Sequence, residues 1–475
     1  MRVLKNALYL GAMQLSNILV ALIVTPYITR IFGSELLGIN SFGLAVVTNF
    51  SIFGLFGITL YGVREIAKVR DSPHLLQDTF SRCITFQLFF SAIAVLIYLG
   101  WILTTRDGYA HYYLLFTLYL LGTATDLTWF YGGLERFDRV AIRTVLMRVF
   151  GGLLVFLLIR QREQLYLLIL IQQGTVLLSN LFYWLPLRTY NIHILLQPIR
   201  STLQKIFVPC LRLFLPIVFT TLLLTIDRIL LGYLSTKQEV AIYDYTARLV
   251  RIAIIVVSVL GNVLLPRFAY LWSNNLRDEF NSTLRKQQFY SLFTSAFVAG
   301  LLFITSADLC ALLFGETFQG AAHLLQFLIF TVCLTGLALY HIGMAVGREK
   351  QILRALILAT LCNVVCNVIL IPHYGSWGAA ISYVATELLL QFYYMFILRD
   401  LLPFRYLLRL FAPLLLVVSV GCWGLTQLHT TSLITELLLR STLFALGYLT
   451  FGLLLFSEAR AFLRSLIERL HGSKK

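Results

Sequence analysis

The chain has 475 residues, of which 59% are apolar or aromatic and only 13% are charged. A soluble protein carries roughly 25% charged residues because its surface must face water, and the mean hydropathy of +0.82 leaves too little polar surface for that. Apolar residues run along the whole chain, which excludes a soluble enzyme and also a soluble domain on a single membrane anchor. The sequence therefore indicates a polytopic membrane protein.

The chain is strongly basic, with 38 Lys and Arg against 22 Asp and Glu. In a soluble protein this excess would suggest a nucleic-acid partner. In a membrane protein it follows from the concentration of Lys and Arg in cytoplasmic loops. We therefore expect no nucleic-acid partner, and no motif in the sequence indicates a cofactor or a metal site.

A transmembrane helix needs about 20 apolar residues to cross ~30 Å of hydrocarbon. Windows of this length predict an all-α protein with fourteen membrane-spanning helices, at 6–29, 37–62, 83–104, 110–133, 142–159, 165–187, 208–231, 241–265, 288–308, 320–345, 352–371, 377–398, 407–426 and 435–457. The connections are short, so no extramembrane domain is expected.

Lys and Arg alternate between the two sides of the predicted helices. With the N-terminus in the cytoplasm, the cytoplasmic segments hold 27 of these residues, counting Arg143, Arg354 and Arg409 in the first turns of the adjoining helices, and the external loops hold 5. The alternation persists through all the predicted helices, and positive charge collects on the cytoplasmic side of a membrane protein. Both termini are therefore predicted to be cytoplasmic.

A weak internal repeat appears at an offset of about 200 residues, or six helices, which is typical of two parallel bundles. The segment 28–31 is echoed by 226–229, and the pair Arg143 and Tyr183 by Arg354 and Tyr394. The predicted divisions are a first six-helix bundle at 1–206, a second at 207–400, two additional helices at 401–457 and a basic amphipathic cytoplasmic tail at 458–475.

Charged residues inside the predicted helices are candidate functional positions, because a charge in hydrocarbon costs at least about 2.5–3.5 kcal/mol. Arg228, Arg248 and Arg251 belong to one predicted helical hairpin, and Asp227 adjoins Arg228. Arg248 and Arg251 are three residues apart, so they share a helix face. We expect this group to face an aqueous cavity.

Other charges inside the predicted helices have structural alternatives. Asp126 either couples transport to an ion or only supports packing next to Trp129. Arg148, Arg212 and Arg440 lie near predicted helix ends, where a long side chain can reach the headgroups instead of a cavity.

Four stretches carry a likeness to a known family: PYITR and ELLGINSF at 26–30 and 35–42, DLTWFYGGLERF at 126–137, DRILLGYL at 227–234 with the following 242–248, and IPHYGSWGAA at 371–380. In this order and on these helices they resemble the Wzx-type polysaccharide flippases, also called O-antigen or oligosaccharide-lipid transporters. The wider superfamily includes the multidrug-and-toxin-extrusion transporters and the lipid II flippase. One departure is Ala241, where the family often has Gly.

The resemblance implies a fold of two six-helix bundles that form a V-shaped central cavity, with two additional C-terminal helices. It implies a transporter rather than an enzyme, working by alternating access in the inner (plasma) membrane of a bacterial cell. The implied cargo is a polyprenyl-diphosphate-linked oligosaccharide, carried from the cytoplasmic to the outer leaflet for O-antigen, capsule or exopolysaccharide synthesis. A polysaccharide polymerase and chain-length proteins are candidate partners.

This cargo predicts the chemistry of its site. A diphosphate is matched by Arg, whose planar fork binds phosphate oxygens in pairs, and sugars are matched by amides, hydroxyls and aromatic faces. The resemblance places helices 1, 2, 7 and 8 around the cavity, so the predicted substrate-binding residues are Arg30, Arg228, Arg248, Arg251, Asn17, Asn40, Tyr27 and Tyr243.

Protons and sodium are the candidate coupling ions. The predicted coupling residues are Asp227, Asp126 and Glu387. Asp227 is expected to pair with an arginine when the cavity is empty.

Other classes of protein remain open. A drug or organic-cation exporter of the same superfamily needs carboxylates in its cavity, whereas this chain has an excess of Arg. A membrane polysaccharide polymerase or ligase carries a large external loop with catalytic residues, whereas the external loops here are short. An uncoupled scramblase or channel is also left open, and the sequence does not identify the glycan.

Overall fold

The computed structural model describes residues 2–427, 432–461 and 464, and these residues form helices and connections without a β-strand. The chain divides into two compact units, Met1–Ala241 and Ile242–Lys475. The predicted bundle boundary at 206/207 concerns the internal repeat and stays a prediction. Most of the predicted amphipathic tail, 462–463 and 465–475, lies outside the described residues.

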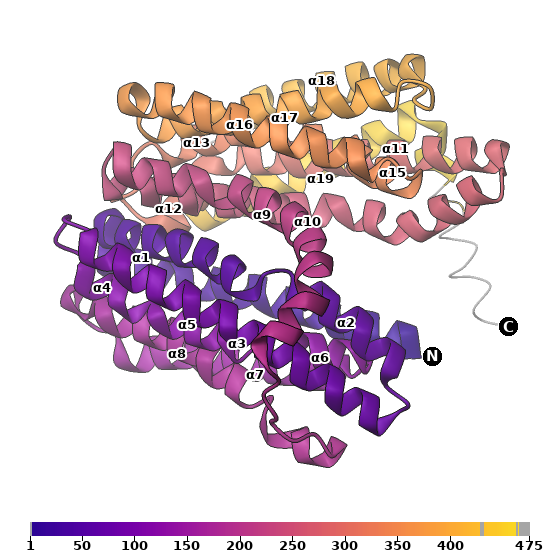
Figure 1. Cartoon of the computed structure of the whole chain (residues 1–475). Helices are drawn as coiled ribbons and strands as arrows, with labels where there is room; N and C mark the ends of the chain where they lie inside the picture. Colours follow the sequence, from indigo (N-terminus) through magenta and orange to yellow (C-terminus); the bar gives the residue numbers. More distant parts are fainter. Residues whose placement is uncertain (1, 428–431, 462–463, 465–475) are drawn as a thin grey trace, which may run out of the picture. The chain divides into compact units, whose positions relative to one another are not determined.

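The first unit contains nine helices and two 3-10 turns among its described residues, followed by the first turn of α10. They are α1 (Arg2–Leu55), α2 (Ile58–Val69), α3 (Pro73–Thr104), α4 (Ala110–Leu115), α5 (Thr117–Ala124), α6 (Thr128–Gly133), α7 (Phe137–Leu158), η1 (Arg162–Gln164), α8 (Leu165–Leu181), η2 (Leu185–Tyr190), α9 (Ile199–Leu234) and α10 (Lys237–Ser273) (Figure 1). α1 packs against α3, α7 and α9, and α5 packs against α8.

A glycine divides α1 into two parts. A straight helix of its 54 residues would be about 80 Å long, far more than the ~30 Å of hydrocarbon. Gly33 has φ 69°, a left-handed conformation that glycine adopts without the clash of a side chain. α1 therefore supplies the predicted helix at 6–29 and most of the one at 37–62.

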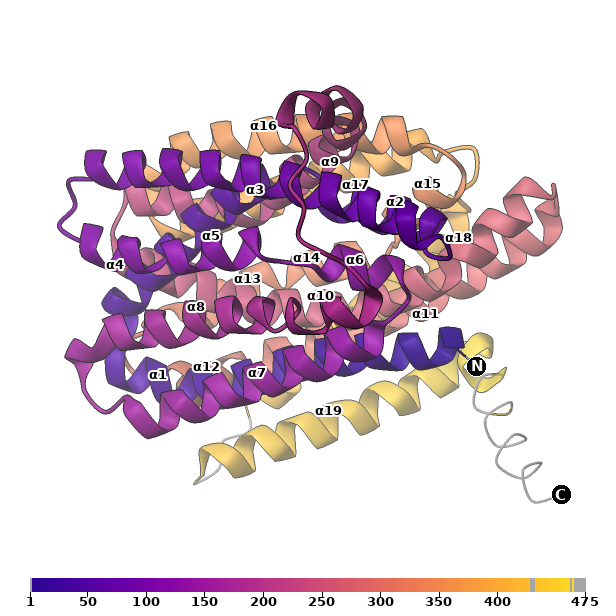
Figure 2. The ribbon, with the colours of Figure 1, turned by 60° about the horizontal axis from the view of Figure 1, so that its bottom comes forward.

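The predicted helix at 110–133 is broken into α4, α5 and α6, which Figure 2 shows as separate segments. A break inside a membrane requires other groups to satisfy the freed backbone. The buried side chain of Gln87 on α3 does this at the second break. Its Nε2 donates to the carbonyls of Thr123, Ala124 and Asp126, at 3.0, 3.1 and 2.9 Å.

The second unit continues α10 and adds nine helices among its described residues. They are α11 (Arg277–Ile304), α12 (Ser306–Phe314), α13 (Ala321–Leu328), α14 (Phe330–Thr335), α15 (Leu339–Ala345), α16 (Glu349–Tyr374), α17 (Ser376–Ile397), α18 (Phe404–Thr426) and α19 (Leu433–Leu455). α16 packs extensively on α17, and α11 packs on α18. Ala338, with φ 52°, separates α14 from α15.

Twelve helical segments of the described chain are long and apolar enough to cross a membrane, against the fourteen predicted. Two differences explain the lower number. α1 and α2 together count as one segment, and 110–133 is divided into three helices that are each too short. The multi-pass, all-helical class is confirmed, and the number fourteen stays a prediction.

The connections of the first unit that are predicted to be external gather at one end. Arg162 Nη2 lies 3.3 Å from Glu35 Oε2, and Lys237 Nζ lies 3.3 Å from Asp107 Oδ2. Gly38 links the two pairs, because a Cβ at this position would overlap the backbone of Lys237. These contacts join the four connections that contain Glu35, Asp107, Arg162 and Lys237.

The connections predicted to be cytoplasmic gather at the other end of this unit. Arg70 Nη1 lies 2.9 Å from Glu135 Oε1. Gln77 donates to the carbonyl of His193 and accepts from its backbone N–H, both at 2.7 Å. The grouping agrees with the predicted alternation, whereas the side that each end faces stays a prediction.

Candidate functional site

Three charged side chains form a cluster on α10, in the second unit. Asp244, Arg248 and Arg251 are four and then three residues apart, so they lie on one helix face. Asp244 Oδ2 accepts hydrogen bonds from Arg248 Nε at 3.1 Å and Nη2 at 2.6 Å. Asp244 Oδ1 accepts one from Arg251 Nη2 at 3.0 Å. One carboxylate therefore holds two guanidinium groups, and we call these residues the Asp244 cluster.

The acid of this cluster is buried and its bases are not. The Asp244 side chain is 0% exposed, whereas those of Arg248 and Arg251 are 35% and 30% exposed. The Arg248 guanidinium also lies 4.4 Å from the centre of the Tyr245 ring, which is buried edge-on against Phe314. Asp244 and Tyr245 thus hold the Arg248 guanidinium in place, while about a third of each arginine side chain stays exposed.

The Asp244 cluster has the composition of an anion site. Two guanidinium groups and one carboxylate sum to a charge of +1. Each guanidinium has five N–H donors in a planar fork, and the hydrogen bonds to Asp244 engage three nitrogen atoms of the pair. The remaining N–H donors are of the kind that binds phosphate oxygens in pairs.

Arg248 and Arg251 were predicted to share a helix face, but Asp244 was not among the predicted site residues. The signal was present, because an acid at i with bases at i+4 and i+7 follows one helix face. Asp244 lies in the first turn of the predicted helix at 241–265, where an acid is usually interpreted as a helix-end residue, whereas α10 begins two turns earlier, at Lys237. The complete burial of Asp244 could not be recognised without the packing.

Asp227 and Arg228, the other charged pair of the predicted hairpin, lie on α9 in the first unit. Asp227 is buried, at 3% exposure, and Arg228 is half-buried. Arg228 Nη2 donates to the carbonyl of Leu224 at 3.0 Å. The predicted pairing of Asp227 with an arginine stays a prediction.

Arg30 and Tyr27, near the end of the first part of α1, have different surroundings. Arg30 is exposed, and its Nη1 donates to the carbonyl of Pro26 at 2.9 Å. The Tyr27 hydroxyl donates to the carbonyl of Ile159 at 2.6 Å, and its ring lies 4.8 Å from that of Phe156. Tyr27 therefore packs α1 on the end of α7. Its hydroxyl, which was predicted to bind sugar, forms a hydrogen bond within the protein instead.

The remaining predicted sugar-binding residues differ in access. Asn17 is exposed, whereas Asn40 and Tyr243 are buried, at 2% and 3% exposure. Asn40 Nδ2 donates to Gln172 Oε1 on α8 at 3.3 Å. Asn40 thus serves the packing of α1 on α8, and of these three residues only Asn17 presents its side chain openly.

The two other predicted coupling acids bind neighbours on their own segments. Asp126 accepts from the backbone N–H of Thr128 at 2.9 Å and from its hydroxyl at 2.8 Å, so it stabilises the start of α6. This geometry favours the structural alternative, because Gln87 at the same break also accepts from Trp129 Nε1 at 2.8 Å. Glu387 accepts from Gln391 Nε2 at 2.8 Å, one turn along α17.

Arg440 on α19 lies in a second charged cluster rather than at a helix end near the headgroups. Its Nη1 is 3.0 Å from Asp308 Oδ2, and its Nη2 pairs with Glu436. The side chains are 6%, 9% and 12% exposed for Arg440, Asp308 and Glu436. We call this the Arg440 cluster. It is closed, because all three side chains are almost completely buried and each acid pairs with Arg440.

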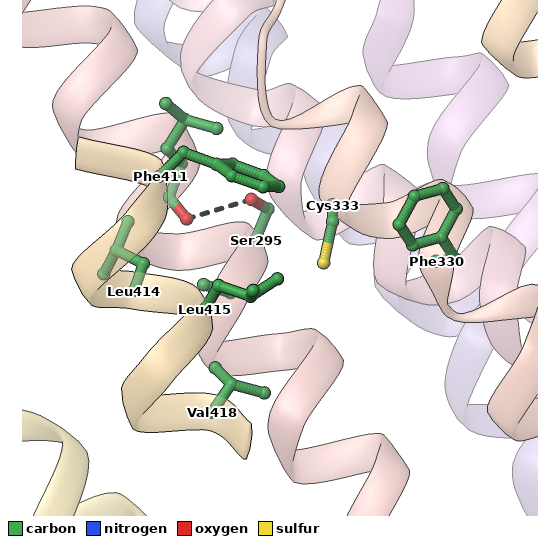
Figure 3. Close-up of a pocket in the computed structure, with 9 residues that line it drawn as sticks. Ser295, Phe330, Cys333, Phe411, Leu414, Leu415 and Val418 are labelled. Carbon is green, nitrogen blue, oxygen red and sulfur yellow. Dashed lines mark hydrogen bonds between the residues drawn. The ribbon is translucent and has the colours of Figure 1, made fainter. Parts of the chain in front are cut away.

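An apolar cavity lies in the second unit among α11, α14 and α18. Figure 3 shows Phe411, Leu414, Leu415 and Val418 beside Ser295, with Cys333 across from them and Phe330 beyond Cys333. Its single hydroxyl, on Ser295, already donates to the carbonyl of Leu292 at 2.9 Å. The cavity therefore offers no group for a phosphate or a sugar, and the Asp244 cluster is the better candidate for an anion.

Comparison with known proteins supports a role in polysaccharide export. The family model described as "Polysaccharide biosynthesis protein" matches residues 3–272, more than half of the chain. A protein of Shigella dysenteriae named as an O-antigen transporter is 24% identical over 395 residues, which cover 81% of this chain and 97% of that protein.

Two solved structures have a similar fold. The lipid II flippase MurJ, in an inward closed conformation, matches with a TM-score of 0.69 at 15% identity, over 97% of this chain and 100% of that one. A multidrug resistance transporter of the MATE family, in the MOP superfamily, matches with a TM-score of 0.59 at 16% identity, over 82% of this chain and 95% of that one. The fold is thus shared by carriers of very different cargo.

Proposed function

The chain belongs to the polysaccharide biosynthesis protein family, and from this premise we propose that it is a flippase for a polyprenyl-diphosphate-linked oligosaccharide. It moves this lipid from the cytoplasmic to the outer leaflet of a bacterial cell membrane. The observation that carries the proposal is the Asp244 cluster, which presents two guanidinium groups from a membrane-spanning helix around one buried acid.

The electrostatics of the cluster suit a diphosphate. An isolated pair of arginines would repel each other and change position, whereas Asp244 holds both in place by charge-assisted hydrogen bonds. The cluster still has a charge of +1, so a diphosphate gains attraction as it leaves water. Arg30 and Arg228 of the first unit are further candidates for the phosphate, and Asn17 for the sugars.

Transport by alternating access requires the loaded site to open to one side of the membrane and then to the other. Protons or sodium ions are the proposed source of the driving force, with Asp227 as the leading coupling residue because it is a buried acid on a spanning helix. Both termini are proposed to be cytoplasmic on the basis of loop charge.

A drug or organic-cation exporter is the main rival, because the MATE fold is similar. The charge of the site separates the two functions. A cation needs an excess of carboxylate, and the Asp244 cluster has an excess of guanidinium. The experiment below therefore offers both kinds of cargo to one preparation.

The test uses the purified protein in liposomes that carry a fluorescent undecaprenyl-diphosphate oligosaccharide in one leaflet. We expect the lipid to appear in the other leaflet, and Arg248→Ala/Arg251→Ala to slow this by about 100-fold or more, because each lost charge-assisted contact is worth about 1.5–3 kcal/mol. The matched control is Arg267→Ala, on the same helix but paired with Glu279 and half exposed. It should retain the normal rate.

A cationic dye in the same liposomes tests the rival function. Export of the dye without movement of the lipid would assign the protein to the drug exporters. Lipid movement that survives in the double variant would contradict the role of the Asp244 cluster.

A further inference from the structure

A histidine inside the second unit joins α15 to α10, the helix that carries the Asp244 cluster. His341 lies on α15, and its Nε2 is 3.1 Å from Oδ1 of Asn262 on α10. The same ring covers the neighbouring Gly261, where a Cβ would come within 2.5 Å of His341 Nδ1. α15 and α10 can therefore approach this closely only with glycine at 261.

The contact with Asn262 fits the neutral tautomer of His341 that carries its hydrogen on Nε2. The amide oxygen accepts, so Nε2 carries the hydrogen, and the neutral ring then has an acceptor lone pair at Nδ1. Nδ1 is buried and has no hydrogen-bond partner among the described residues. A second proton would convert Nδ1 into a donor that faces Gly261 with nothing to accept its hydrogen bond, which is costly for a buried group.

Among the described residues, none of the charged groups on the elements next to this contact forms an ion pair with His341. The charged and titratable groups on these elements include Tyr340 beside it on α15, Glu387 and Tyr394 on α17, Glu349, Lys350 and Arg354 on α16, Arg348 in the connection, and Arg267 on α10. Glu387 accepts from Gln391, and Arg267 pairs with Glu279. Tyr340 has a ring contact with His341, at 5.5 Å and nearly perpendicular.

Arg348 forms a two-bond ion pair with Asp400, at 2.9 and 2.6 Å. These hydrogen bonds hold the pKa of Asp400 below its ordinary value. The pair therefore stays ionised throughout the range in which histidine titrates, and it does not contribute a change of charge there.

We propose that His341 is a positioning residue that latches α15 to α10 while it is neutral and releases it when protonated. The neutral ring fits against Gly261 and is held by Asn262. The charged ring has an unmatched donor in this contact, so protonation favours a separated arrangement of the two helices. The connection after α15 is predicted to be cytoplasmic, so the latch responds to protons on that side.

The consequence for transport rests on the proposed function. α10 carries both Gly261 and the Asp244 cluster, so release of α15 removes a constraint from the helix that positions the arginines. His341 then acts through α10 without contact with the cargo. The latch itself is a property of the second unit and is tested without any substrate.

The test is hydrogen exchange of the α15 amides of the full chain in nanodiscs, corrected for intrinsic rates, at about pH 7.5 and about pH 5.5, on either side of the ordinary histidine pKa of about 6.5. We expect protection of residues 339–345 to fall several-fold, and by at most about tenfold, at the lower pH, because one histidine that is protonated only in the opened state can shift a local opening no further over this range. His341→Asn, which keeps a neutral polar group, should show the same protection at both pH values.

Gly261→Ala is the second arm. Its methyl group should separate the helices as protonation does, so protection of α15 is low at both pH values. Gly447→Ala on α19 is the matched control, because a Cβ there meets nothing within 4 Å, and it should behave like the unmodified chain.

Unchanged protection of α15 in the unmodified chain between the two pH values would overturn the latch, as would an unaltered pH response in His341→Asn. If Gly261→Ala fails to fold, the His341→Asn comparison still decides. Loss of lipid transport with an intact pH response of α15 would count against the proposed function and leave the latch standing.

Discussion

The Asp244 cluster and the Arg440 cluster use the same residue types inside membrane-spanning helices, yet they differ in stoichiometry and in access. The first has two arginines around one acid, and both arginines are about one-third exposed. The second has one arginine between two acids, and its side chains are almost completely buried. Both are ionic, but only the first has arginines that are partly exposed.

This difference shows why charge in a predicted span does not identify a site by itself. A closed ion cluster holds helices together, here α19 and α12 through Arg440 and Asp308. An open cluster, in which partly exposed arginines outnumber the acids, keeps a net positive charge that can attract an anion. The ratio of bases to acids and the exposure of the bases separate the two roles.

The largest expected effect comes from breaking the closed cluster. Arg440→Met leaves the carboxylates of Asp308 and Glu436 buried without their guanidinium, which costs about 3–5 kcal/mol for a buried pair. We expect the free energy of unfolding in detergent to fall by this amount. Arg267→Met, which breaks an exposed pair, should cost less than about 1 kcal/mol.

A second change shows whether the loss arises from the uncompensated acids. Asp308→Asn and Glu436→Gln, added to Arg440→Met, should recover part of the stability because neutral groups tolerate burial better. Equal unfolding energies for Arg440→Met and Arg267→Met would contradict the structural role of the cluster.

The open cluster should respond in transport more than in stability. Asp244→Asn keeps the shape of the side chain but removes the charge that holds Arg248 and Arg251. We expect flipping to slow by about tenfold, equivalent to about 1.4 kcal/mol, because the guanidinium groups lose their fixed orientation. The unfolding energy should fall less than in Arg440→Met, since both arginines reach solvent. A normal flipping rate would show that Asp244 does not position them.

Much of the fold could be predicted from hydropathy, because the bilayer requires long apolar helices and the loop charges alternate. The broken segment at 110–133 could not. Its interruption depends on Gln87, which comes from a different helix and satisfies three carbonyls at the break. Nothing within 110–133 itself reveals that these carbonyls have an outside donor.

The site residues stay predictions, and the structure adds contacts that the sequence could not show. Arg248 and Arg251 were recognised because a basic pair on an apolar helix is visible in the sequence. Tyr27 and Asn40 were predicted to bind sugar from their residue type. In the structure, Tyr27 donates a hydrogen bond to the carbonyl of Ile159, and Asn40 donates one to Gln172. A polar side chain in a span binds a cargo or another helix, and only the packing distinguishes these outcomes.

Asp227 extends the comparison to the first unit, where a buried acid adjoins Arg228 on α9. Asp227→Asn keeps the volume and removes the charge. We expect flipping to slow several-fold, by about 1 kcal/mol, and to lose its response to an imposed proton or sodium gradient. Glu35→Gln, in an exposed pair with Arg162, is the control and should keep that response. A normal rate and response in Asp227→Asn would reject Asp227 as the coupling residue.

The smallest effect is expected outside the membrane, where Arg348 and Asp400 form an ion pair with neither the burial of the Arg440 cluster nor the excess charge of the Asp244 cluster. The Asp400 side chain is 54% exposed, so water screens the pair and it contributes about 0.2–1 kcal/mol. Its hydrogen bonds to Arg348 lower the pKa of Asp400. The contribution is therefore complete above the ordinary Asp pKa of about 3.9 and is lost as the pH falls through the lowered value. The unmodified chain should unfold at a slightly higher temperature than Arg348→Gln near neutral pH, and this difference should close in acid. If this difference in unfolding temperature persisted below about pH 2, Arg348 would stabilise its connection through packing and not through its charge. Even this exposed pair would then resemble the closed Arg440 cluster more than an ordinary surface contact.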